Sequence, residues 1–197
     1  MPLGAACGAA PKEPRRCMKP ETERLFYERI TRHHAEALQD ELCDPRVYEH
    51  IDDGKVPTPG QLLESFVRRE AGAPSHRRSE TWLDFAVRLK STGEGIGRVE
   101  ATVLGRQAEL AYLFGYRHWG HAYAREAVQW LERLIAEEHA VDDFWATVHP
   151  GNRRSMALLN RLGYAEAPRS RWPTRLTSHD EGDRVFHRPC ERPDGVA

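Results

Sequence analysis

The segment from Tyr116 to Ala127, YRHWGHAYAREA, places small residues and basic side chains where a strand pattern gives way to a helix pattern. The first backbone N–H groups of a helix have no partner inside the helix and carry a partial positive charge, so they bind phosphate well. Gly120, Ala122 and Ala124 would let a pyrophosphate approach the backbone closely. Side-chain donors would come from Arg117, His118, His121 and Arg125. The segment predicts a phosphate-binding loop, although an ordinary strand-to-helix turn with surface histidines explains it equally well.

A second candidate segment follows about thirty residues later and reads HPGNRRSMALLNRLGY. Asn152 is suited to cap the N-terminus of the helix that this segment predicts. The hydroxyl of Ser155, one turn later on the same face, either bonds to the helix backbone or offers a proton to a ligand. Gly163 is the residue on which this helix would close.

The elements that must position these two segments follow from hydrophobic patterning. Short runs of alternating apolar and polar residues, joined by Gly-containing turns, indicate an antiparallel meander followed by further strands. We expect strands near residues 24–30, 81–90, 96–104, 108–116, 142–149, 164–169 and 184–188. A first helix is expected from a Thr31 cap to Pro45. A second begins at a Thr58 cap and Pro59 and has an apolar stripe of Leu62, Leu63, Phe66 and Val67. Two more helices are expected from about 122 to 139 and from Asn152 to Gly163. Trp82, Trp130 and Trp145 are expected in the core.

The two candidate segments together resemble the GNAT superfamily of N-acetyltransferases. HWGHAYAREA (118–127) is similar to a motif of the branch containing ribosomal-protein N-terminal acetyltransferases. The later motif of that branch is matched by Asn152, Ser155, Leu159, Gly163 and Tyr164. The opening TERLFYERIT and the helix after it also resemble the family's first strand and helix, so the resemblance covers about Glu21 to Arg188.

The resemblance implies that acetyl-CoA is the co-substrate and that the stretch from Trp119 to Ala124 is its pyrophosphate loop. Ala122 stands where the family usually has a central Gly, and a second frame, Arg117-x-x-Gly120-x-Ala122, fits the generic motif as well. Asn152 would bond the pantetheine arm, and Ser155 would donate to the departing thiolate. The expected acetyl-CoA-binding residues are Phe114, Arg117, Trp119, Gly120, His121, Ala122, Tyr123, Ala124, Asn152 and Ser155.

This sequence departs from the family at two catalytic positions. Many members have a general-acid tyrosine seven residues after the Asn, where this chain has Leu159. Some use a strand-borne Glu as general base, where this chain has Thr147. Ser155 or a water would then serve the thiolate, unless the thiolate, with a reference pKa of about 8.5, leaves without an acid.

The meander offers a substitute for the missing base. If Leu104 pairs with Ala108 across the turn, then Glu100 pairs with Tyr112, near the expected opening for the acetyl group. Glu100 is therefore the expected catalytic base, although a solvated strand carboxylate is the simpler alternative. Glu181, in the polar loop before the last strand, is a further candidate.

Composition limits the remaining classes of function. The formal net charge of −1 argues against general nucleic-acid binding. No apolar run is long enough for a membrane span or a signal peptide, and the four cysteines show no metal-ligand spacing, so we expect free thiols, no metal and a cytoplasmic location.

The sequence thus predicts an α/β GNAT fold, with a mixed, mostly antiparallel sheet of six or seven strands and about four helices. Its domain would span residues 21–190, between a disordered tail (1–20) and a short tail (191–197). The expected reaction is direct acetyl transfer from acetyl-CoA to a primary amine of a small molecule or a peptide N-terminus. The alternative is an acyl-CoA-binding regulatory module without turnover, and a homodimer remains open.

Overall fold

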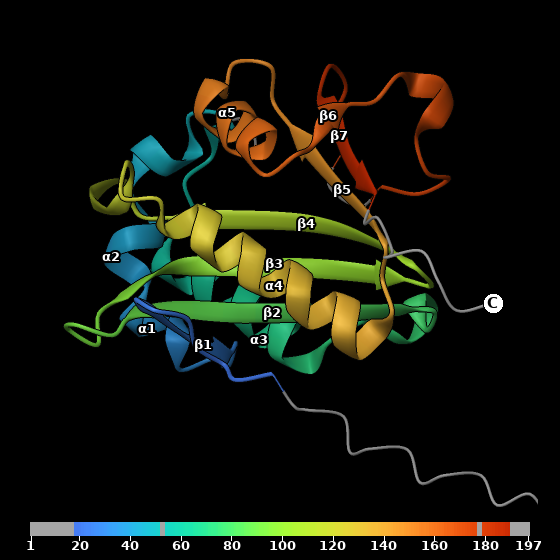
Figure 1. Ribbon diagram of the computed structural model, residues 1–197. Coiled ribbons are helices and arrows are strands. Elements are labelled where there is room, and N and C mark those ends of the chain that lie inside the picture. Colours follow the sequence, from blue (N-terminus) through green and yellow to red (C-terminus); the bar gives the residue numbers. More distant parts are fainter. Residues whose placement is uncertain (1–17, 52–53, 177–178, 190–197) are drawn as a thin grey trace, which may run out of the picture.

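A computed structural model of the protein describes residues 18–51, 54–176 and 179–189. Within these residues seven strands form one sheet in the order β1-β2-β3-β4-β5-β7-β6 (Figure 1). The strands are β1 (Leu25–Arg29), β2 (Glu80–Leu89), β3 (Gly95–Leu104), β4 (Gln107–Phe114), β5 (Asp143–Val148), β6 (Ala165–Glu166) and β7 (Arg184–Pro189). All neighbouring pairs are antiparallel except β4 and β5, which are parallel. This confirms the predicted mixed, mostly antiparallel sheet.

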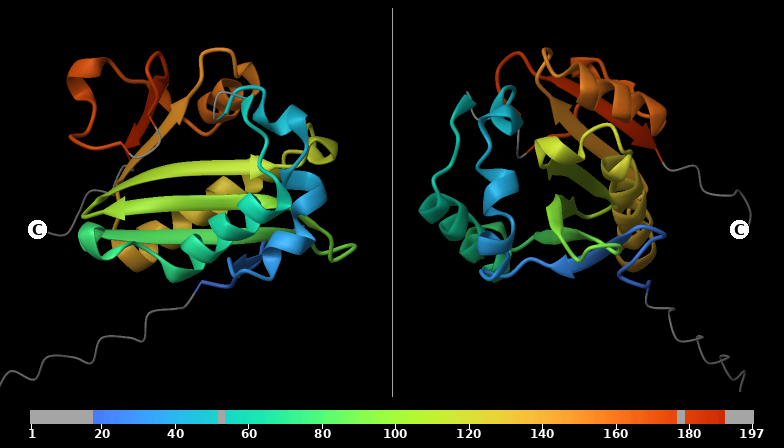
Figure 2. Two further views of the ribbon diagram at one scale, coloured as in Figure 1. Left: turned by 180° about the vertical axis from the view of Figure 1, so that it is seen from behind. Right: turned by 90° about the vertical axis from the view of Figure 1, so that its left-hand side faces the viewer.

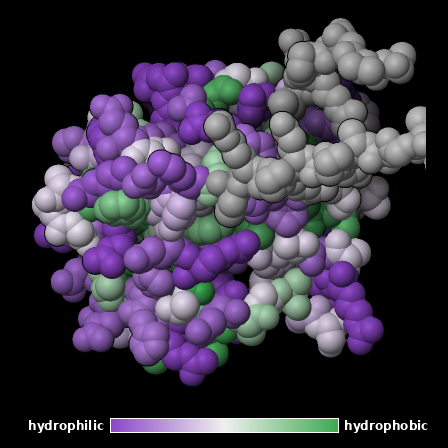
Figure 3. All heavy atoms as spheres, turned by 60° about the horizontal axis from the view of Figure 1, so that its bottom comes forward, coloured by the Kyte–Doolittle hydropathy of each residue, from purple (hydrophilic) through white to green (hydrophobic). Residues whose placement is uncertain are grey.

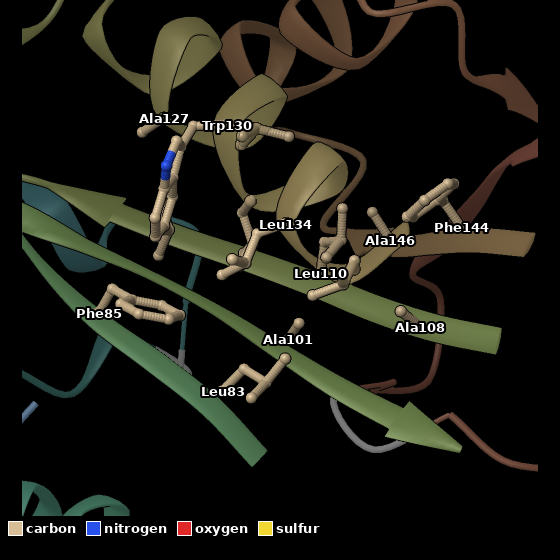
Figure 4. Packing of buried hydrophobic residues seen from close by; sticks show 14 of the residues in the cluster. Leu83, Phe85, Ala101, Ala108, Leu110, Ala127, Trp130, Leu134, Phe144 and Ala146 are labelled. Carbon is tan, nitrogen blue, oxygen red and sulfur yellow. The ribbon is translucent and has the colours of Figure 1, made fainter. Parts of the chain in front are cut away.

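Helices cover both faces of this sheet. The α-helices are α1 (His34–Ala37), α2 (Gln39–Leu42), α3 (Pro59–Ala71), α4 (Tyr123–His139) and α5 (Arg153–Arg161). Figure 2 shows α4 on one face of the meander and α1, α2 and α3 on the other. Buried residues of β2 to β5 and α4 form the main core, and a second cluster lies under α1 to α3. Figure 4 shows Trp130 of α4 reaching toward Phe85 of β2, where their rings pack edge to face at 4.9 Å.

The parallel pair β4–β5 opens the sheet. The two strands pair only at their beginnings, from Gln107 opposite Asp143 to Glu109 opposite Trp145. The later residues of β5 have no partner in β4, whereas the other edge of β5 pairs with β7 along its whole length. Consequently β4 and β5 diverge, and the backbone of their later residues borders a gap between the strands.

The turn between β3 and β4 corrects the predicted register. Leu104 pairs with Gln107, not with Ala108, so the loop holds two residues and Glu100 pairs with Ala111. Tyr112 pairs with Val99. Because successive side chains of a strand point to opposite faces, the shift by one residue places Glu100 and Tyr112 on opposite faces of the sheet.

The helix predictions hold in part. Thr58 caps α3 in a capping box with Gln61, and Pro59 opens the helix, as predicted. Leu62 and Phe66 are buried, but Leu63 and Val67 are 45% and 39% exposed, so the apolar stripe is narrower than predicted.

The first predicted helix is two single turns, α1 and α2, which meet at Leu38. Thr31 does not cap it, because its hydroxyl contacts Nδ1 of His34 at 3.1 Å. Its predicted apolar face, Ala35, Leu38 and Leu42, is nevertheless buried.

The surface is mixed in character. Trp130 and Trp145 are buried as predicted, whereas Trp82 is only half-buried and lines a cleft.

In Figure 3 the uncovered part of one face is mainly hydrophilic, with separate hydrophobic patches. No helix among the described residues is long and apolar enough to cross a membrane. Most of the predicted tail before residue 21, and the tail after 190, lie outside the described residues.

Candidate active site

The loop between β4 and α4 leaves the start of α4 open. Gly120 and Ala122 both have positive φ, of 81° and 61°, and these two reversals lead the chain into the helix. Ala122 is the N-cap residue, and no side chain caps the helix there. An alanine in the left-handed region is strained, whereas a glycine would not be. The first N–H groups of this 17-residue helix therefore have no side-chain cap, as phosphate binding at a helix start requires.

Side chains just before β1 support this loop and the start of α4. The guanidinium of Arg24 donates to the carbonyl of His121 at 2.9 Å and to Oε2 of Glu126 at 2.7 Å. It also lies 4.7 Å from the ring centre of Tyr123. Burial alone would raise the pKa of Glu126, but hydrogen bonds from Thr22 and Arg24 outweigh it and lower that pKa. The carboxylate of Glu126 thus stays charged and anchors Arg24 under the loop.

Trp119 connects the loop to the end of β4 and to the start of α5. Its Nε1 donates to the carbonyl of Phe114 at 2.9 Å, at the end of β4. The guanidinium of Arg154, in the first turn of α5, lies 3.6 Å from the Trp119 ring centre. Phe114 itself is buried in the main core, so its contribution to a ligand site would come from its backbone.

Two of the predicted phosphate donors have other partners. Arg117 forms a salt bridge with the buried carboxylate of Glu41 in α2 and lies 3.8 Å from Glu94. Nε2 of His118 lies 3.6 Å from Glu41 and 3.8 Å from Glu94. Potential ligand atoms of Glu41, Glu94 and His118 come within 4.8 Å of one another, an arrangement that sequence spacing did not predict. The guanidinium of Arg117 already balances the Glu41 carboxylate, so this cluster serves as an ionic link between the loop and α2.

A cleft of about 1210 Å³ runs along the opened sheet. Residues of α3, of strands β2 to β5, of the start of α5 and of the loop before β7 line it. Asn152, Ser155 and Tyr112 lie in its wall, and Glu100 lies in it as well. The two predicted catalytic residues, Glu100 and Ser155, thus both line one cleft.

The start of α5 carries two polar residues, Asn152 and Ser155, that line the cleft. Oδ1 of Asn152 accepts a hydrogen bond from the backbone N–H of Ser155 at 3.0 Å, so Asn152 is the helix cap. The side-chain amide nitrogen takes no part in that bond, so capping and ligand binding are compatible. The hydroxyl of Ser155 lies 2.7 Å from the hydroxyl of Tyr112. Burial raises the pKa of Tyr112 to about 12.

Glu100 lies on the other face of the sheet, beside α3. Its Oε2 contacts guanidinium groups of Arg69 and Arg98. Arg69 also donates to the buried Asp84 at 2.5 Å. The floor of the cleft is thus a chain of two carboxylates and two guanidinium groups. Glu181, the second base candidate, is exposed in the loop that lines the mouth of the cleft.

Comparison with known proteins assigns these features to a family. The sequence model of the family described as "Acetyltransferase (GNAT) domain" matches residues 24–165, which include the loop, the cleft strands and all of α5. The chain belongs to the GNAT acetyltransferase family. This confirms the family that the two sequence motifs predicted.

Similar proteins agree with this assignment. A Bacillus licheniformis protein described as uncharacterized N-acetyltransferase p20 is 34% identical over 83 residues, which cover 41% of this chain and 47% of that protein. The chain spans about half the length of the curated relatives it matches.

Solved structures show the same fold. A GNAT-family acetyltransferase from Bacillus anthracis superimposes with a TM-score of 0.70 at 18% identity, over 87% of this chain and 98% of that one. A ribosomal L7/L12 alpha-N-protein acetyltransferase in complex with coenzyme A gives 0.68 at 14% identity, over 86% and 96%.

In this GNAT protein, Tyr112 was expected only as the partner of Glu100 beside the opening for the acetyl group, and no role was predicted for its hydroxyl. The residue lies in a strand whose alternate side chains are buried, so its pattern indicated only packing. Leu159, at the position where many members have an acid, is buried in the main core. Only the packing of α5 against the opened sheet brings the Tyr112 hydroxyl to Ser155.

Proposed function

We propose that this GNAT protein transfers an acetyl group from acetyl-CoA to a primary amine of a small molecule or a peptide N-terminus. The observation that carries the proposal is the uncapped start of α4 beside the gap between β4 and β5. The helix start would bind the pyrophosphate, as helix N-termini bind anions elsewhere. The pantetheine arm would then run toward the gap, past Asn152. The residues along this proposed path belong to one continuous region of the chain, residues 115–155.

The acceptor would enter from the α3 side of the cleft. There its nitrogen attacks the thioester carbon, an N–C bond forms, and the C–S bond breaks to release the CoA thiolate. The ammonium form of the acceptor must first lose a proton, for which Glu100 is the proposed acceptor. Because both guanidinium contacts of Glu100 are to Oε2, the proton would go to Oε1. Ser155 would donate a hydrogen bond to the thiolate from the opposite face of the sheet.

The acceptor is expected to be cationic before it reacts. Asp180, Glu181 and Asp183 lie in the loop that lines the cleft. Carboxylates there would attract an ammonium group before its deprotonation. Lys55, Arg68 and Arg77 line other parts of the same cleft, so the attraction would be local to this loop.

Two measurements test the proposal in sequence. Calorimetry with acetyl-CoA should show binding, and the absence of binding at millimolar CoA would overturn it. Thiol release should then appear with at least one member of a panel of peptides, polyamines and amino sugars. Binding without thiol release from any acceptor would instead support an acyl-CoA-binding module.

A further inference from the structure

Tyr112 and Ser155 form a pair on the face of the sheet opposite Glu100. Tyr112 comes from β4 and Ser155 from α5, and their hydroxyl oxygens are 2.7 Å apart. The Tyr112 hydroxyl is also 3.5 Å from the backbone carbonyl of Ser155, at the limit of hydrogen bonding. The short contact between the two hydroxyls is therefore the dominant one. Both residues line the cleft at the edge where β4 leaves β5.

The donor in this pair follows from chemistry. A phenol is a stronger acid than an aliphatic alcohol and is therefore the stronger hydrogen-bond donor. If Tyr112 donates to Oγ of Ser155, the hydrogen of the serine hydroxyl is directed away from Tyr112. Among the described residues, the Ser155 hydroxyl has no hydrogen-bond partner other than the Tyr112 hydroxyl. The serine hydrogen is thus free to point into the cleft.

We propose that Tyr112 is a positioning residue, which holds the Ser155 hydroxyl so that its hydrogen points at the sulfur of CoA. This inference rests on the proposed function, because it requires CoA in the cleft. Tyr112 itself keeps its proton throughout: an alkyl thiol has a pKa of about 8.5, whereas that of Tyr112 is raised to about 12. A thiolate would not remove a proton from so weak an acid. The pair stabilises the departing thiolate by a directed hydrogen bond, and the thiol gains its proton later from water.

Bound CoA provides a test that needs no acceptor. The ultraviolet absorbance of the thiolate reports the pKa of the CoA thiol in the complex. With the wild-type protein this pKa should lie about one pH unit or more below that of free CoA, since hydrogen bonds to charged groups are strong. Ser155→Ala should remove the shift. Tyr112→Phe should remove most of it, a change of about three- to tenfold in the thiol ionisation constant.

Desulfo-CoA, which has no sulfur, is the matched control. Tyr112→Phe should bind desulfo-CoA as the wild type does, while it binds CoA at pH 9 about three- to tenfold more weakly. In the double variant, Tyr112→Phe should add nothing to Ser155→Ala, because Tyr112 acts only through Ser155. A merely structural role would weaken both ligands alike and would lower the melting temperature.

The outcomes separate the two proposals. Failure of the wild-type protein to bind either ligand overturns the proposed function. Normal CoA binding, with the same thiol pKa in wild type and Tyr112→Phe, overturns the role of Tyr112 and leaves the proposed function standing. Should Tyr112→Phe fold poorly, Ser155→Ala still tests whether a hydroxyl directed at sulfur lowers the thiol pKa, and an unchanged pKa there also overturns the inference.

Discussion

At the scale of single residues, the candidate site depends on a few residues, each of which can be replaced by a residue that lacks only one chemical property. Ala122 adopts a backbone conformation suited to glycine. Asn152 caps a helix and lies in the cleft wall. Glu100 is held by two arginines in a cleft that the proposed reaction would use. Each can be changed with a control that separates structure from ligand binding.

Ala122→Gly should stabilise the protein by about 1 kcal/mol, because glycine adopts positive φ without strain. The melting temperature should rise by about 2–4 °C, with acetyl-CoA binding retained. Ala124→Gly, two residues later inside α4, is the matched control and should destabilise by a similar amount.

Ala122→Glu should abolish acetyl-CoA binding through bulk and repulsion of phosphate. Normal binding by Ala122→Glu would mean that the phosphate does not approach this residue.

Asn152 is expected to bind the pantetheine arm through its amide group. Asn152→Ala should therefore raise KM for acetyl-CoA about three- to tenfold and lower stability by about 1 kcal/mol. Asn152→Ser keeps a good capping residue but loses the amide, so it should raise KM to the same extent without the stability loss. If Asn152→Ser leaves KM unchanged, Asn152 is a cap only.

Glu100→Gln keeps the shape of the side chain and removes its ability to accept a proton. With an acceptor identified by thiol release, kcat/KM should fall about 10²–10⁴-fold while acetyl-CoA affinity stays nearly intact. The deficit should shrink as pH rises, since more of the amine is then already neutral. If Glu100→Gln keeps the wild-type rate from about pH 6 to 9, Glu100 is excluded as the base. Glu181→Gln would then be the next variant to measure.

At the scale of elements, β1 supports the loop before α4. Arg24, just before β1, donates to the carbonyl of His121, and the carboxylate of Glu126 in α4 orients the Arg24 guanidinium. These contacts join segments about one hundred residues apart in the chain, so they appear only in the folded protein. The loop conformation therefore depends on the pairing of β1 with β2 as well as on its own sequence.

Arg24→Lys tests this support. Lysine keeps the charge but lacks the planar fork that contacts both Glu126 and His121, so acetyl-CoA affinity should fall about three- to tenfold. Arg32→Lys is the matched control. Arg32 follows β1 in the chain, is exposed and pairs with Glu70, so this variant should leave the acetyl-CoA affinity unchanged. Full affinity in Arg24→Lys would show that only the charge of Arg24 matters.

At the scale of the whole molecule, three tyrosines in or against the main core make stability fall at alkaline pH. The pKa values of Tyr27, Tyr112 and Tyr164 are all raised, chiefly by burial. In the unfolded chain these phenols ionise near pH 10. As pH rises above about 10, the unfolded state loses protons that the folded state still holds, so stability falls.

Tyr112→Phe should therefore flatten this alkaline loss. The stability that Tyr112 contributes is fully present below about pH 10 and is lost toward its folded-state pKa of about 12. Denaturant unfolding between about pH 8 and 11 should show a smaller decrease for Tyr112→Phe than for the wild type. Equal slopes would show that the Tyr112 pKa is not raised by folding.

The boundary of the domain can be tested by truncation. The carbonyl of Lys19 accepts a hydrogen bond from Trp130 at 3.0 Å, and that of Pro20 accepts one from the Tyr27 backbone at 2.8 Å. A chain that starts at Met18 should melt within a few degrees of the full chain, whereas one that starts at Glu21 should lose clearly more stability. A large loss from removal of residues 1–17 would show that this segment packs on the domain.

The sequence alone determined the elements and the family. Alternation at period two and helical stripes predicted the strands and the longer helices, because they record which side chains are buried. Gly120, Ala122 and Asn152 were also predicted from local chemistry, since helix starts depend on neighbouring residues.

Tertiary structure decided which side chains meet. The two-residue turn between β3 and β4 set the register and moved Glu100 to the face opposite Tyr112. The pairing of β4 with β5 ends after Glu109, which opens the sheet, and the packing of α5 brings Ser155 to Tyr112. Long-range contacts of this kind depend on the geometry of whole strands and helices, and no local pattern in one chain segment encodes them.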